Sequence, residues 1–211
     1  MVRAIIFLVI GILVGGSVVY IVIDSQETTT AVAAVTAATK DYASEKVTLP
    51  VDGADYKVLG QLAGLKKFAV AYEDSLIRGG EVYHDDAADV LNQYGIKLII
   101  SVTPNDKERE FCQKYGFELL EIPFEKIDGP EQALLENFLY AVDQASGNVY
   151  VHCHGGTHRA GALCMAYRIH TQKWDTERAL LEYLKLGGDL QTDQGMIKRV
   201  MNYQKTTVAK E

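Results

Sequence analysis

The sequence has few cysteines, and their arrangement excludes two common classes of small protein. Only Cys112, Cys153 and Cys164 occur among 211 residues. They are too few and too scattered to form a disulfide framework. No CxxC pair is present, so neither a zinc ribbon nor a thioredoxin-type redox motif is indicated. Because their number is odd, at least one thiol is free.

The chain also lacks an excess of positive charge. Its formal net charge is −7, and it contains no basic run. This argues against a nucleic-acid partner. An anionic substrate would therefore have to be attracted by a local group of donors. The apolar share of 48% and the charged share of 23% are those of a globular protein.

Charge is absent altogether from residues 4–23. About 20 apolar residues in a helix are enough to cross a hydrocarbon core of about 30 Å. The sequence therefore predicts an N-terminal transmembrane helix, with residues 1–24 as a membrane anchor. A cleaved signal peptide is the alternative, since the small residues Ala31–Ala33 are typical of a cleavage site.

The charges around this stretch predict an orientation and a division of the chain. Arg3 precedes the stretch, whereas Asp24 and Glu27 follow it. Positive-inside reasoning then keeps the N-terminus cytoplasmic and places the rest of the chain in the periplasm or outside the cell. Residues 25–55, rich in Thr and Ala, are expected to form a flexible linker, and residues 56–205 the folded domain.

From residue 56 onward, short β-branched runs alternate with amphipathic segments. Strands are expected at Lys97–Val102, Phe117–Ile122 and Asn148–His152, each bounded by Gly or Pro. Helices are expected near residues 85–94, 107–115, 131–145, 159–170, 175–186 and 194–204. This alternation predicts an α/β fold with a central, mostly parallel sheet flanked by helices.

One segment carries the elements of a phosphate site. The strand Asn148–His152 leads into Cys153, and a short loop then reaches Arg159 at the start of a helix. Glycines in such a loop allow backbone N–H groups to face an anion, and the helix adds the positive end of its dipole. Arg159 can bind two phosphate oxygens, and Cys153 is expected to attack as a thiolate. The loop residues expected to bind substrate are His154, Gly155, Gly156, Thr157 and His158.

His152-Cys153 through Arg159 resembles the HC-x5-R signature of the protein tyrosine phosphatase superfamily. The domain is similar to small, atypical dual-specificity phosphatases in Ser75–Gly80, in Tyr94–Ser101 and in Ala166–Arg168. The resemblance implies the phosphatase fold of that group and a cysteinyl-phosphate intermediate. It also implies that neither a metal nor an organic cofactor takes part. A zinc site made by the crowded His and Cys side chains would need a further ligand from elsewhere.

The resemblance further implies an aspartate general acid on a loop before the cysteine. Within Ile122–Pro130 we assign this role to Asp128, with Glu125 as the rival. The alternative is that Asp128 caps the helix that opens near Pro130.

One position departs from the family pattern. Ala160 stands where a serine or threonine hydroxyl usually stabilises the departing thiolate, so we expect slow breakdown of the cysteinyl-phosphate. The first hypothesis is a phosphatase that acts on phosphotyrosine, with phosphoserine and phosphothreonine as further substrates. Inositol phosphates are a second hypothesis for the substrate, because Gly156–Arg159 resembles a "GKHR" motif with Thr157 in place of lysine. Two hypotheses from different classes are a phosphate-binding pseudophosphatase and a rhodanese-like sulfurtransferase.

Overall fold

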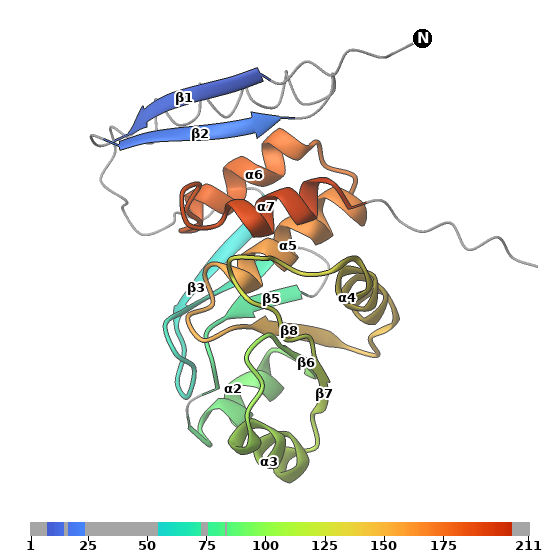
Figure 1. Cartoon of the computed structure of the whole chain (residues 1–211). Helices are drawn as coiled ribbons and strands as arrows, with labels where there is room; N and C mark the ends of the chain where they lie inside the picture. Colours follow the sequence, from blue (N-terminus) through green and yellow to red (C-terminus); the bar gives the residue numbers. More distant parts are fainter. Residues whose placement is uncertain (1–7, 15–16, 24–54, 73–75, 83, 204–211) are drawn as a thin grey trace, which may run out of the picture.

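The computed structural model describes residues 8–14, 17–23, 55–72, 76–82 and 84–203 (Figure 1). A six-stranded sheet in the order β3-β4-β5-β8-β6-β7 forms the centre of the domain. Its strands are β3 (Tyr56–Gln61), β4 (Phe68–Tyr72), β5 (Leu76–Gly79), β6 (Ile96–Ser101), β7 (Glu118–Glu121) and β8 (Asn148–His152). Three of these were predicted, and β8 has the predicted bounds.

The sheet is mixed. The strands β5, β8, β6 and β7 run parallel to one another, which confirms the prediction of a mostly parallel central sheet, although β5 itself was not predicted. The pairs β3–β4 and β4–β5 are antiparallel and were not predicted. Only a short connection separates β3 from β4, and such a connection joins antiparallel strands, whereas a parallel pair needs a longer crossover.

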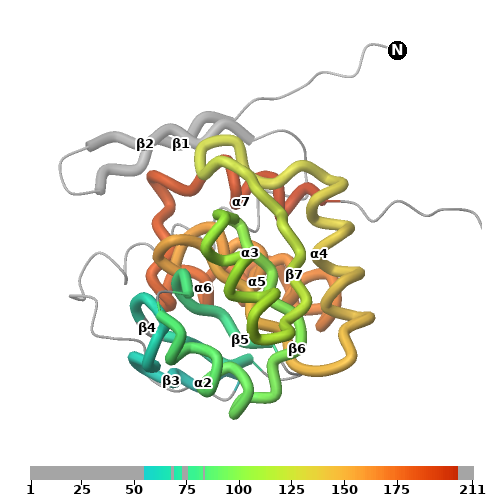
Figure 2. The backbone as a smooth tube through the Cα atoms, turned by 90° about the horizontal axis from the view of Figure 1, so that it is seen from below, coloured from blue at the N-terminus to red at the C-terminus, as the bar shows by residue number. Residues whose placement is uncertain are grey.

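Helices cover both faces of the sheet, as expected. They are α2 (Ala87–Gln93), α3 (Asp106–Tyr115), α4 (Gln132–Gln144), α5 (Arg159–His170), α6 (Thr176–Lys185) and α7 (Gln194–Met201). Figure 2 views the domain from the side of α2 and α3, which lie on the opposite face from α5, α6 and α7 in Figure 1.

Alternate side chains of the central strands form two separate cores. Val149 and Val151 of β8 pack with residues of α4 to α7, whereas Tyr150 packs with residues of α2 and α3. A strand buried on both faces explains the continuous apolar run of β8. The C-terminal end of β8 is thereby held between two parallel neighbours and two cores.

The predicted N-terminal helix is not observed. The described residues of that stretch form two strands, β1 (Leu8–Val14) and β2 (Ser17–Ile23), paired antiparallel with Val14 opposite Ser17. Both sequences are rich in valine and isoleucine, whose branched side chains favour strands, and Gly-Gly between two such runs is a hairpin signal. None of the helices within the described residues has the length and apolar character needed to cross a membrane.

The expected linker falls almost entirely on residues outside the described ranges. Its only described residue is Asp55, which forms an ion pair with Arg178 at 2.7 Å. The domain boundaries and the extracytoplasmic location stay predictions from the sequence.

Candidate active site

The strand, loop and helix expected around Cys153 are all present. Cys153 follows directly after β8 and is buried, with 4% of its surface exposed. His158 occupies the N-cap position of α5, and Arg159 is its first residue. We call residues 153–158 the cysteine loop. It lies at the C-terminal ends of the parallel strands, the usual location of ligand sites in α/β sheets.

Close packing against the end of β5 shapes the cysteine loop. Gly156 has a φ of 71°, a backbone conformation that residues other than glycine rarely adopt. A Cβ atom on Gly156 would lie 2.3 Å from the carbonyl carbon of Gly79 and 2.5 Å from the nitrogen of Gly80. The hydroxyl of Tyr150 donates to the Gly80 carbonyl at 2.5 Å. The cysteine loop therefore packs on the backbone of Gly79 and Gly80, which Tyr150 of β8 holds in place through its hydrogen bond.

Lys67 reaches the open side of the loop at Gly155. A Cβ atom built on Gly155 would lie 3.3 Å from the Lys67 ammonium nitrogen. Lys67 lies between β3 and β4, is exposed, and has a φ of 59°. Sequence reasoning missed this lysine because the hairpin that carries it was not predicted.

His154 and Thr157 make contacts that support the loop itself. The His154 ring is 63% exposed and lies 3.0 Å from a carboxylate oxygen of Glu81 and 2.6 Å from the Lys66 ammonium. The Glu81 N–H donates to the His154 carbonyl at 3.4 Å, and the Thr157 hydroxyl donates to the Gly155 carbonyl at 3.3 Å. Their expected roles in substrate binding stay predictions.

Arg159 links the cysteine loop to residues 122–130, which we call the acid loop. Its Nη1 donates to the carbonyl of Phe124 at 3.4 Å. Because this acceptor is uncharged, it does not offset the positive charge that the guanidinium presents to an anion. The structure thus brings together the two segments that the sequence assigned to the nucleophile and to the general acid.

Asp128 lies in an exposed turn between β7 and α4. The N-cap of α4 is Glu131, so the alternative in which Asp128 caps that helix is wrong. Among the described residues, no hydrogen bond or ion pair engages the Asp128 side chain. Its rival, Glu125, is also exposed. The assignment of Asp128 as general acid stays a prediction.

A buried carboxylate holds His158 of the cysteine loop. Asp193, with none of its surface exposed, accepts from His158 Nδ1 at 2.7 Å and from the Tyr183 hydroxyl at 2.6 Å. Lys126 of the acid loop lies 2.9 Å from the other carboxylate oxygen. Burial would raise the pKa of Asp193, but the bonds from His158, Tyr183 and Lys126 outweigh burial and lower this pKa well below its usual value.

Sequence reasoning missed Asp193 and Lys126. Asp193 stands directly before α7 and therefore reads as an ordinary helix cap, and its partners lie 10, 35 and 67 positions away in the sequence. No short-range pattern marks such a cluster.

A second buried carboxylate lies behind the loop. Glu108 of α3 contacts His152 Nε2 and accepts from the Ser101 hydroxyl at 2.6 Å. Glu108, His152 and Ser101 are all buried. The residue before Cys153 is thereby fixed from β6 and α3, as a loop-orienting histidine requires. Arg78, also buried, donates to the Leu186 carbonyl at 3.0 Å beside the first turn of α5.

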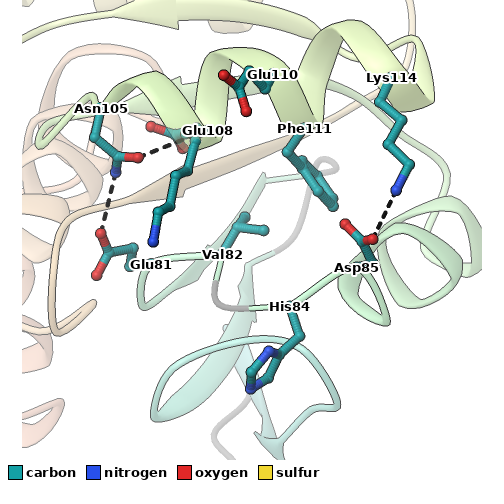
Figure 3. A pocket seen from close by; sticks show the side chains of 10 residues that line it. Glu81, Val82, His84, Asp85, Asn105, Glu108, Glu110, Phe111 and Lys114 are labelled. Carbon is teal, nitrogen blue, oxygen red and sulfur yellow. Dashed lines mark hydrogen bonds and ion pairs between the residues drawn. The ribbon is translucent and has the colours of Figure 1, made fainter.

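A cavity of about 430 Å³ lies next to the loop (Figure 3). Asn105 Nδ2 donates to Glu81 at 3.2 Å across it, and Lys114 pairs with Asp85 at 2.7 Å at its other end. Its lining includes neither Cys153 nor Arg159. Glu81 is the residue that the cavity shares with the surroundings of the loop.

The chain belongs to the family of dual specificity phosphatase catalytic domains, whose sequence model matches residues 80–210. Dual specificity protein phosphatase 1-A of Xenopus laevis is 30% identical over 113 residues, covering 50% of this chain and 29% of that protein. Dual specificity protein phosphatase 1 of Homo sapiens is 29% identical over 110 residues, with the same coverage. The chain thus spans less than a third of the length of these relatives.

Solved structures show the same fold. The crystal structure of P. aeruginosa TpbA superposes with a TM-score of 0.59 at 22% identity, covering 70% of this chain and 90% of that one. The catalytic core of the PP-IP phosphatase SIW14 from S. cerevisiae superposes with a TM-score of 0.53 at 17% identity, covering 63% and 82%.

Proposed function

We propose that this protein is a cysteine-dependent phosphatase that hydrolyses phosphotyrosine, and phosphoserine or phosphothreonine in addition, through a cysteinyl-phosphate intermediate. One observation carries the proposal. A buried cysteine leaves the central parallel strand into a loop that is closed by Gly156 against β5 and followed by Arg159 at a helix start. Membership of the dual specificity phosphatase family supports it. A TpbA variant in which a cysteine is replaced by serine has a similar fold, and its crystal structure was solved in complex with phosphotyrosine.

In the proposed first step, the Cys153 thiolate attacks phosphorus and the bond from phosphorus to the ester oxygen breaks. Asp128 gives its proton to the leaving oxygen, which departs as the alcohol. In the second step Asp128 takes a proton from water, which attacks the cysteinyl-phosphate and releases inorganic phosphate and the thiolate. Arg159 and the loop amides hold the phosphoryl oxygens in both steps.

The surroundings of Ala160 bear on the second step. Ala160 is fully buried, so no solvent molecule at its Cβ replaces the missing hydroxyl. We therefore assign slow hydrolysis of the cysteinyl-phosphate to this enzyme, with a burst of phenol release before the steady state.

The test is hydrolysis of p-nitrophenyl phosphate and of a phosphotyrosine peptide. Cys153→Ser should abolish turnover, Arg159→Lys should lower kcat/KM, and Asp128→Asn should lower kcat by about 10²–10⁴. Activity retained in Cys153→Ser would refute the proposal. An inactive wild-type protein that still binds the phosphopeptide would instead identify a phosphate-binding module.

Inositol phosphates are a second candidate, which the position of Lys67 favours. Thr157 replaces the lysine of the "GKHR" motif, but Lys67 brings an ammonium group to the neighbouring Gly155 from outside the loop. No hydrogen bond or ion pair to the described part of the chain engages this group. It is therefore available for a second phosphate beside the one being removed.

The variant Lys67→Gln tests this candidate. It should lower kcat/KM for an inositol polyphosphate more than for the phosphotyrosine peptide. Lys97→Gln, an exposed change at the opposite end of the sheet, is the control. Equal losses on both substrates would remove the inositol phosphate candidate.

A further inference from the structure

Asp193 contacts both loops of the site without belonging to either. It lies between α6 and α7, on a segment that no sequence motif marks. We propose that Asp193 is a positioning residue that sets the acid loop against the cysteine loop, so that Asp128 is presented to the leaving oxygen. This inference rests on the proposed phosphatase function.

The first contact of Asp193 is with the acid loop. The Lys126 ammonium lies 2.9 Å from Asp193 and donates to the Thr192 hydroxyl at 2.8 Å. Lys126 and Asp128 belong to the same turn, so fixing one restricts the other.

Backbone packing reinforces this contact. A Cβ atom on Gly195 would lie only 1.8 Å from the carbonyl oxygen of Ile127. One on Gly129 would lie 2.7 Å from the Cα of Met196. The turn that carries Asp128 is therefore seated directly on the start of α7, within two or three residues of Asp193.

The second contact is with the cysteine loop. His158 Nδ1 bonds to Asp193 at 2.7 Å, and His158 directly precedes Arg159. Arg159 in turn donates to Phe124 of the acid loop at 3.4 Å. The contacts thus form a closed ring, from Asp193 through Lys126 and Phe124 to Arg159 and back through His158.

Asp193 is itself rigidly held. The Tyr183 hydroxyl and the Asp189 N–H donate to the oxygen that also binds His158, at 2.6 and 2.8 Å. These donors stabilise the ionised form, which is why the pKa of Asp193 lies below its usual value despite burial. Lys126 and the Thr192 hydroxyl engage the other oxygen, at 2.9 and 3.1 Å. A buried, charged acceptor with five donors has one low-energy arrangement, and both loops must conform to it.

A positioning role makes a chemical prediction that a purely structural role does not. Protonation by Asp128 matters most when the leaving group is a poor one, because a stable phenolate departs without a proton. Loss of the link to the acid loop should therefore lower kcat/KM for phenyl phosphate much more than kcat/KM for p-nitrophenyl phosphate.

The decisive variant is Lys126→Met, which removes the link to the acid loop and leaves His158 and Tyr183 bonded to Asp193. Because hydrolysis of the shared cysteinyl-phosphate is the slow step, the comparison uses kcat/KM, which reports the first step. We expect kcat/KM to fall at least 10-fold more on phenyl phosphate than on p-nitrophenyl phosphate. Lys126→Arg should restore the wild-type ratio. Lys114→Met, which breaks the exposed pair with Asp85, is the matched control. Asp193→Asn should give a larger effect in the same direction.

Combination with Asp128→Asn completes the test. If Asp193 acts through Asp128, adding Lys126→Met to Asp128→Asn should leave the ratio between the two substrates unchanged. The inference is overturned if Lys126→Met lowers kcat/KM equally for both substrates or leaves both values unchanged. It is also overturned if Lys126→Met changes the ratio further in the Asp128→Asn background. Failure of the proposed function would be recognised separately, by turnover that survives Cys153→Ser.

Discussion

Replacing Gly156 by alanine tests whether the cysteine loop depends on its packing against β5. The substitution forces a side chain into a left-handed conformation, with a φ of 71°. This costs about 1–2 kcal/mol. It also places a Cβ atom 2.3 Å from the Gly79 carbonyl carbon and 2.4 Å from its oxygen. Both contacts are with backbone, which cannot rotate away as a side chain can.

Relief of that overlap requires the loop or the end of β5 to shift, at a cost of about 1–3 kcal/mol. The two effects together lower the free energy of unfolding by about 2–5 kcal/mol. For a protein of this size, about 2–4 °C of melting temperature corresponds to each kcal/mol. The expected drop is therefore about 4–20 °C, accompanied by loss of phosphatase activity because the loop amides move.

Trp174, the only tryptophan in the sequence, reports unfolding by fluorescence. Its ring lies 4.1 Å from the Arg168 guanidinium carbon and 3.6 Å from that of Arg178, contacts that unfolding breaks. Gly155→Ala is the matched control, because its Cβ would meet only the mobile end of Lys67 and should change stability by less than about 1 kcal/mol. Equal melting temperatures for the two variants would refute the proposed packing of the loop.

Three further predictions concern the groups around the site. Burial raises the pKa of the Cys112 and Cys164 thiols to about 12, so iodoacetamide at pH 7–8 should label Cys153 alone in the native protein. Mass spectrometry that finds Cys164 labelled first would contradict this prediction. Glu182→Ala should lower stability by about 3–5 kcal/mol, because it leaves the buried Arg168 without the carboxylate that it contacts at 2.9 Å, whereas the exposed Glu177→Ala on the same helix should cost less than about 1 kcal/mol. Asp193→Asn should destabilise the protein at neutral pH. The native pKa of Asp193 is below its unfolded value of about 3.9, so the ionised form stabilises the fold above that pH. The loss of unfolding free energy in the variant, measured by urea unfolding, should therefore shrink as the pH falls below about 4. A loss that stays constant down to about pH 3 would show that the charge is not what stabilises the fold.

Local patterns predicted the parallel strands β6, β7 and β8 but missed β3, β4 and β5. The bounds of β8 follow from one β-branched run between a glycine and the cysteine loop. The strands β3 and β4 have no such run: β3 contains Lys57, Gly60 and Gln61, and its pairing is irregular between Val58 and Gly60. The prediction of a helix in the N-terminal stretch was wrong for a different reason. A long uncharged run fits both a helix and a hairpin of valine-rich strands, and composition alone does not separate them.

The same division holds for the site. Cys153, Arg159 and the two loop glycines are neighbours in the sequence, so one motif revealed them together. Asp193 and Lys67 come to the loop from distant segments, and each residue type is common on protein surfaces. Only the packing of α7 and of the β3–β4 hairpin gives them a role, which no sequence pattern encodes.

The distribution of carboxylates explains how a chain with a net charge of −7 can attract a phosphate dianion. Two carboxylates beside the loop are each bound by two cationic or imidazole groups: Glu81 by Lys66 and His154, and Asp193 by Lys126 and His158. A third, Glu108, is buried against Ser101 and His152. The Lys66 and Lys126 ammonium groups offset the charges of Glu81 and Asp193, and the same two carboxylates hold His154 and His158 of the cysteine loop. Among the described residues around the loop, the side chains of Arg159, Lys67 and the buried Arg78 have no carboxylate partner. The field that an incoming phosphate meets is therefore set by these three side chains and the start of α5.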